Sequence, residues 1–124
     1  MKKYIEVRAK EIPLYRGYLV IILSNSRKKI RKLIPEFDES YVYAHSYFSN
    51  YRNRQGFFMI LDPFAKYRAI KYGVIAHEGV HLANMILSRR GLEPSFVNDE
   101  AVAYLAEWIV DLAHQTIKKN GWVI

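Results

Sequence analysis

The chain of 124 residues contains no cysteine. Disulfide bridges and thiolate metal sites are therefore excluded, and any bound metal ion must be held by nitrogen and oxygen ligands. A cysteine-free composition is also compatible with a protein that works in the reducing cytoplasm.

Long apolar runs are absent as well. The longest run near the N-terminus, Leu19 to Leu23, is too short for the core of a signal peptide or for a membrane span. The basic start Met1-Lys2-Lys3 is typical of a leader, but charged residues between Glu6 and Glu11 interrupt the segment after it. We therefore expect a protein that stays in the cytoplasm and does not enter a membrane.

Acidic residues are scarcer than basic ones, 12 against 19, which gives a formal net charge of +7. This balance favours acidic partners, although the charge is spread along the chain. Apolar residues make up 51% and charged residues 25%, a composition typical of globular proteins. The length predicts a single domain, residues 1–124, large enough to bury its own core.

Apolar patterns predict the strands. Residues 3–9 give a weak strand signal, and the continuous run Tyr18–Leu23 predicts a central strand buried on both faces. Residues 41–51 alternate as a half-buried strand does, and a second buried strand comes next at 56–61. The polar turn between these last two segments predicts a hairpin.

The alternating strand carries a row of tyrosines. One face would hold Tyr41, Tyr43, His45, Tyr47, Ser49 and Tyr51. Such a row could stack on bases or grip a peptide, but a half-buried sheet face covered by a helix is the favoured interpretation. For the same reason His45 is interpreted as structural rather than as a metal ligand.

Helical spacing predicts three helices. The first covers about 27–34, with Asn25 or Ser26 as its N-cap. Its basic side, Arg27 to Lys32, is interpreted as a solvated face, and a patch for nucleic acid is the alternative. A second helix would start at Asp62-Pro63, with a break near Gly73, and a third would run from an Asn98 cap to Lys119. Together these elements predict an α+β domain: a three- or four-stranded, mostly antiparallel sheet backed by two long helices.

The second helix contains the pattern His-Glu-x-x-His. His77 and His81, four residues apart, would lie on one face of the helix and aim two imidazoles at a common point, as a tetrahedral Zn²⁺ requires. Glu78 comes directly after the first histidine, where a carboxylate can take a proton from metal-bound water. Uncharged neighbours allow this helix to be buried.

A third ligand is expected at the start of the last helix. If the two long helices pack side by side, Glu100 could meet the histidines and complete a site for one zinc ion. Asp99 is the rival ligand. An acid in the first turn of a helix is also stabilised by the helix dipole without any metal, so both interpretations stay open.

These residues resemble the gluzincin branch of the zincin metallopeptidases, in which His-Glu-x-x-His is followed by a glutamate on the next helix. The resemblance covers about residues 72–110, and the segment from Asn98 to Tyr104 is similar to the glutamate-bearing helix of that branch. The chain length and this segment also resemble small metallopeptidase-like proteins encoded by phages and prophages. The resemblance implies a minimal zincin-like fold.

The function expected from these features is zinc-dependent hydrolysis of a peptide or protein substrate, with His77, His81 and Glu100 as ligands and Glu78 as general base. The oxyanion would be stabilised by the metal together with Tyr72, Tyr104 or a strand tyrosine. One alternative is a metal-stabilised binding or assembly protein without catalysis. The other is a basic nucleic-acid-binding domain that uses Arg27 to Lys32 and the tyrosine row.

Overall fold

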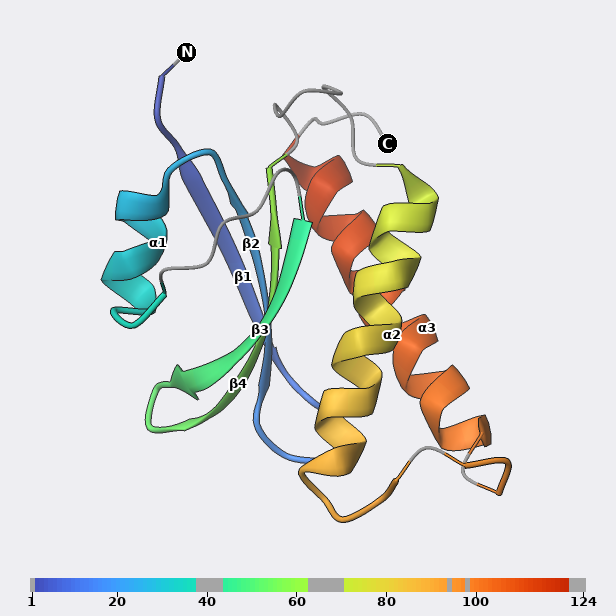
Figure 1. Cartoon of the computed structure of the whole chain (residues 1–124). Helices are drawn as coiled ribbons and strands as arrows, with labels where there is room; N and C mark the ends of the chain where they lie inside the picture. Colours follow the sequence, from blue (N-terminus) through green and yellow to red (C-terminus); the bar gives the residue numbers. More distant parts are fainter. Residues whose placement is uncertain (1, 38–43, 63–70, 94, 98, 121–124) are drawn as a thin grey trace.

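The computed structural model describes residues 2–37, 44–62, 71–93, 95–97 and 99–120 (Figure 1). The described elements are β1 (Ile5–Glu11), β2 (Tyr18–Ser24), α1 (Arg27–Leu33), β3 (Ala44–Tyr51), β4 (Arg54–Leu61), α2 (Tyr72–Ser88) and α3 (Asp99–Lys119). The four strands form one sheet in the order β1-β2-β4-β3. Helix α1 covers one face of this sheet, and α2 and α3 cover the other, so the fold has three layers (Figure 1).

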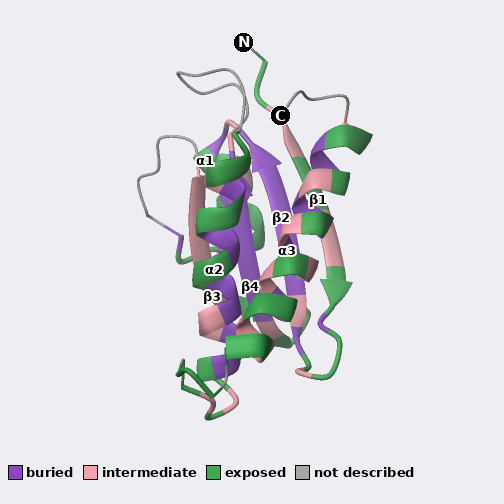
Figure 2. Ribbon diagram, turned by 90° about the vertical axis from the view of Figure 1, so that its right-hand side faces the viewer, coloured by how far each residue is buried: buried purple, intermediate pink, exposed green. Residues whose placement is uncertain are grey.

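The central strand β2 is buried on both faces, as its sequence predicts. Leu19, Ile21 and Leu23 pack toward α2 and α3, whereas Val20 and Ile22 pack toward α1. Figure 2 shows this burial along the middle of the sheet, with exposed residues on the outer sides of the helices. The α+β class is therefore confirmed.

The sheet is mixed. β1 and β2 are antiparallel, and so are β3 and β4, but the central pair β2 and β4 is parallel, with Ile21 opposite Met59. The expectation of a mostly antiparallel sheet therefore holds for the two outer pairs and misses the central one. Strands buried on both faces are typical of parallel pairing, which requires a connection that crosses the sheet. Here α1 and β3 lie in that connection.

The hairpin of β3 and β4 is tighter than the sequence suggests. Only Arg52 and Asn53 connect the strands, with φ of 51° and 63°. Two consecutive positive φ values are typical of a type I′ turn, whose twist matches that of the paired strands.

The described part of the tyrosine row supports its structural interpretation. Tyr47 and Tyr51 are half-buried and pack against the apolar cluster beneath α1. The ring of His45 lies 6.1 Å from the ring of Phe37, centroid to centroid, in the same layer. Tyr41 and Tyr43 lie outside the described residues.

Two helix ends agree with local sequence signals, whereas α2 begins at Tyr72 after Lys71, whose side chain makes no capping hydrogen bond. Ser26 caps α1 by accepting a hydrogen bond of 3.2 Å from the Lys29 amide. Gly91 follows the end of α2 and has a φ of 75°. A glycine in the left-handed region is common just after the end of a helix. The starts expected at Asp62-Pro63 and Asn98 involve residues outside the described part. Among the described helices, none has both the length and the apolar character to cross a bilayer.

Candidate metal site

Helix α2 is fixed between the sheet and α3. Its buried face includes Ile75, Leu82 and Ile86, which belong to the larger core cluster. On the side toward α3, a Cβ atom at Gly79 would lie 2.8 Å from Val110 Cγ2. Glycine lowers the stability of a helix interior, but at this position it allows the two helices to approach closely.

The two motif histidines meet on the exposed side of α2. His77 Nε2 lies 3.1 Å from His81 Nε2, and the rings are nearly perpendicular, with an angle of 80° between their planes. The distance suits an N–H···N hydrogen bond between neutral imidazoles. It also suits a metal, because two Zn–N bonds of 2.0–2.1 Å at a tetrahedral angle place the nitrogens about 3.3 Å apart. The donor set and its spacing therefore fit two ligands of a zinc ion.

Glu78 points toward the sheet. The side chain is 9% exposed, and its Oε1 accepts a hydrogen bond of 2.8 Å from Ser46 Oγ on the edge strand β3. A charged hydrogen bond of this kind offsets part of the cost of burying a carboxylate. Glu78 is thus fixed in orientation, and it is adjacent to His77 in the sequence of α2.

Glu100 does not join the histidines. The two helices pack side by side as expected, but the contact runs through Gly79, and positions 77 and 81 are each about 160° around the helix from it. The imidazoles therefore lie on the side of α2 that faces away from α3. Within the ranges that the structure describes, no three His, Cys, Asp or Glu side chains form a group that could hold a metal ion.

Glu100 is also displaced along the helix axis. Gly79 faces Ala106 to Val110, and Glu100 lies six residues before Ala106, which corresponds to about 9 Å along α3. The side chains of Glu100 and its rival Asp99 are both exposed in the first turn of α3. Their described position suits a favourable interaction with the helix dipole.

The tyrosines expected near the oxyanion lie on different surfaces. Tyr104 lines an apolar cavity with residues of the turn between β1 and β2, and α2 contributes none of the lining. Tyr72, in the first turn of α2, stacks on His114 of α3, with ring centroids 4.9 Å apart. Neither arrangement tests the catalytic role expected for Tyr104.

The basic residues of α1 lie on its solvent side. Arg27, Lys28, Arg31 and Lys32 are exposed, while Ile30 and Ile34 are buried against the sheet. The Nε atom of Arg31 donates a hydrogen bond of 2.7 Å to the Phe37 carbonyl. This arrangement agrees with a solvated helix face, and nucleic-acid binding by this segment stays a prediction.

Ser46 is the site residue that the sequence does not single out. The alternation of the strand places it on the face opposite the tyrosine row, between the apolar residues Ala44 and Phe48. A hydroxyl on an apolar sheet face is a signal that a polar partner covers it. The sequence does not show that this partner is Glu78.

Comparison of the chain with protein-family models, with curated proteins and with solved structures gives no match. The gluzincin resemblance therefore rests on the motif residues themselves. Of these, the structure brings together His77 and His81, with Glu78 beside them in sequence.

Proposed function

We propose that the protein is a zinc-dependent hydrolase, with a peptide or protein as substrate, whose site is centred on His77, Glu78 and His81. The observation that supports the proposal is the 3.1 Å separation of the two Nε2 atoms, both on the exposed side of α2. A zinc ion at this pair would have its remaining positions toward solvent, where a substrate could reach it.

Each residue has a distinct task in this proposal. His77 and His81 would hold the zinc through Nε2, and the ion would polarise a substrate carbonyl and lower the pKa of water. Glu78 would serve as the general base toward that water. The hydrogen bond from Ser46 to Oε1 fixes the orientation of that carboxylate.

Glu100 as a third ligand and Tyr104 as an oxyanion donor stay predictions within this proposal. Since α3 meets α2 on the side away from the histidines, ligation by Glu100 would require its segment to take another position. Glu100→Ala tests this directly, because it changes zinc affinity only if the carboxylate reaches the ion.

A second candidate function is a metal-stabilised binding or assembly protein without catalysis. The burial of Glu78 and its hydrogen bond to Ser46 favour this alternative, because both would also suit a carboxylate that attaches α2 to the sheet edge. Under this alternative, zinc binding raises the stability of the fold and no substrate is cleaved.

The test combines zinc binding and turnover. Zinc affinity is measured by competition with a chromophoric chelator, and hydrolysis is measured on an unfolded protein substrate. We expect about one zinc ion per chain in the wild type, with binding lost in His77→Ala and in His81→Ala. Glu78→Gln should retain zinc and lose hydrolysis.

His45→Gln is the matched control, because His45 packs beside Phe37 in the layer of α1 and should leave zinc affinity unchanged. Zinc binding that raises the melting temperature, with no hydrolysis by the wild type, would support the non-enzymatic alternative. Absence of zinc binding at millimolar metal would overturn both.

A further inference from the structure

Three segments meet at one end of the sheet: the turn between β1 and β2, the start of β4 and the end of α2 (Figure 1). The turn has an unusual backbone, with positive φ at Leu14 (68°), Arg16 (62°) and Gly17 (83°). A Cβ atom at Gly17 would lie 2.8 Å from the Gln55 carbonyl oxygen, so glycine is required for this close approach.

Arg90 holds this arrangement together. Its guanidinium donates hydrogen bonds to the Tyr15 carbonyl, to the Arg16 carbonyl at 3.1 Å and to Gln55 Oε1 at 2.6 Å. All of these acceptors are neutral oxygens. Among the described residues, therefore, no carboxylate pairs with the positive charge of Arg90.

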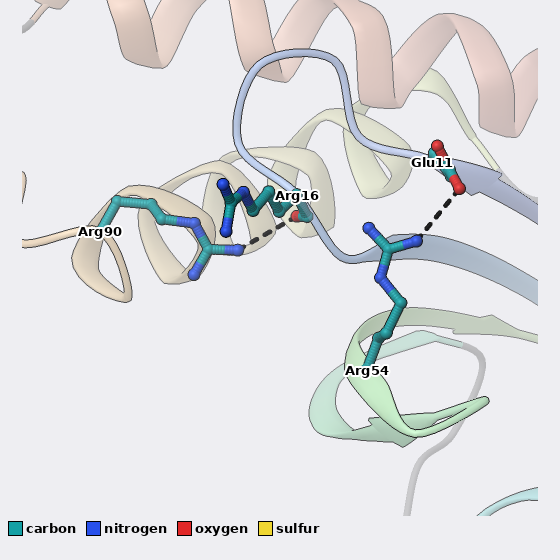
Figure 3. Close-up of polar contacts among 4 residues, drawn as sticks. All are labelled: Glu11, Arg16, Arg54 and Arg90. Carbon is teal, nitrogen blue, oxygen red and sulfur yellow. Dashed lines mark hydrogen bonds and ion pairs between the residues drawn. The ribbon is translucent and has the colours of Figure 1, made fainter.

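A cavity of about 490 Å³ opens at this point, and three arginines line it: Arg16, Arg54 and Arg90. Figure 3 shows the side chains of these arginines. None of the described lining residues is acidic. Just beside it, Glu11 pairs with Arg54 at 3.0 Å and neutralises one of the three charges. The charges of Arg16 and Arg90 remain. Arg90 already donates through Nε, Nη1 and Nη2 to protein oxygens, so it contributes mainly its charge. The planar fork of Arg16 suits a phosphate or carboxylate group.

A second, apolar cavity of about 320 Å³ adjoins the first. Its lining consists of Pro13, Leu14, Tyr15, Ala101, Tyr104, Leu105 and Trp108. Leu14 and Tyr15 line both cavities. Leu14 is 94% exposed although it is apolar, and its positive φ is unfavourable for a branched side chain.

We infer that the two cavities form one binding site for an organic anion, that is, a phosphate or carboxylate group attached to an apolar body. The anion would contact Arg16 and Arg90, and the apolar body would lie between Leu14 and Trp108. Both volumes lie in the range of small-molecule sites. His77, Glu78 and His81 line neither cavity, so this inference does not depend on zinc binding at the histidine pair. Tyr104, the residue expected to donate to the oxyanion, is shared with the lining of the apolar cavity.

Fluorescence of Trp108 offers a direct measurement, with Trp108→Phe as the control that assigns the signal. Phenyl phosphate and benzoate carry an anion on an apolar ring, whereas inorganic phosphate and benzyl alcohol each carry only one of the two features. We expect phenyl phosphate, benzoate or both to bind at least about tenfold more tightly than inorganic phosphate and benzyl alcohol. The better of the two aryl ligands identifies the anionic group.

Two variants separate the contributions. Arg16→Ala should weaken binding of the aryl anion about tenfold, because a charged hydrogen bond is lost. Lys28→Ala on α1 removes the same charge far from the cavity and should leave binding within about twofold. Leu14→Gly suits the positive φ, so the fold is retained, and it should weaken the aryl anion while leaving inorganic phosphate unchanged.

Equal weakening by Arg16→Ala and Lys28→Ala would show that only diffuse positive charge attracts the anion, and would overturn the inference. So would aryl anions that bind no more tightly than inorganic phosphate, because the apolar cavity would then contribute nothing. Zinc affinity should be the same in Arg16→Ala and in the wild type, which keeps this result separate from the zinc proposal.

Discussion

Ser46 Oγ lies 2.8 Å from Glu78 Oε1 and 3.3 Å from the Glu78 backbone oxygen, so one hydroxyl on the edge strand β3 lies near two acceptor oxygens of this residue in α2. A serine hydroxyl has a single proton to donate, and the shorter contact goes to the carboxylate. The pair ties the helix to the sheet at the residue directly after the first motif histidine.

Loss of this hydroxyl should destabilise the fold. We expect Ser46→Ala to lower the free energy of unfolding by about 1–3 kcal/mol, because it leaves a buried carboxylate without its hydrogen bond. Urea unfolding at neutral pH measures the effect. Ser49→Ala is the matched control, because Ser49 lies on the same strand as Ser46 and donates its hydrogen bond to the exposed carboxylate of Glu36. This substitution should lower the free energy of unfolding by less. Equal losses in the two variants would contradict the prediction.

Replacing glycine by alanine inside a helix usually stabilises a protein. The close contact of α2 and α3 at Gly79 predicts the opposite effect at this position. Gly79→Ala should destabilise the fold, because its Cβ would meet Val110 Cγ2 at 2.8 Å. Gly73→Ala, near the start of the same helix with no atom within 4 Å of its Cβ, should stabilise the fold by about 0.5 kcal/mol.

The clash at Gly79 can be isolated with a double-mutant cycle. In a Val110→Ala background the obstructing methyl group is absent, so Gly79→Ala should become neutral or stabilising. Thermal unfolding of the four proteins measures the coupling. Additive effects of the two substitutions would show that the Val110 methyl does not set the helix separation.

Arg90 should contribute more to stability than its neighbour Arg89. Arg90 fastens the turn between β1 and β2 through hydrogen bonds to Tyr15, Arg16 and Gln55, whereas Arg89 lies 3.9 Å above the ring of Phe48. We expect Arg90→Ala to cost about 2 kcal/mol and Arg89→Ala about 0.5–1 kcal/mol in unfolding experiments. The reverse order would contradict the fastening role of Arg90.

Ser49 should set the acid titration of Glu36. The Ser49 hydroxyl donates a hydrogen bond to Glu36 Oε1, which holds the pKa of this carboxyl below its usual value, and the Glu36 backbone amide acts in the same direction. Because the folded pKa is lowered, the interaction stabilises the fold above the unfolded pKa, and the effect is lost as the pH falls through the folded pKa. The carboxyl is exposed, so the contribution to stability is small.

An NMR titration of the Glu36 carboxyl carbon measures this directly. In Ser49→Ala the pKa should move up toward the ordinary value of a glutamate, because the donor that favours the charged form is gone. An unchanged pKa in the variant would show that the backbone amide alone lowers it.

Local signals determined much of the fold. Continuous apolar runs identify β2 and β4, because a strand covered on both faces needs apolar side chains at every position. Ser26 and Gly91 mark helix ends through chemistry confined to a few neighbouring residues. The alternation of the strand through His45 and Tyr47 likewise separates the face toward α1 from the face toward α2.

Tertiary structure alone decided how these elements meet. The parallel pairing of β2 with β4 depends on the path of the chain between them, which no local pattern encodes. The i, i+4 spacing brings His77 to His81 within a single helix, so the sequence determines that pair by itself. Which side of α2 faces α3 is decided by the contact of Gly79 with Val110, and this contact turns the histidines away from Glu100. Distances within one helix are set by its period, whereas distances between helices are set by the side chains that pack between them.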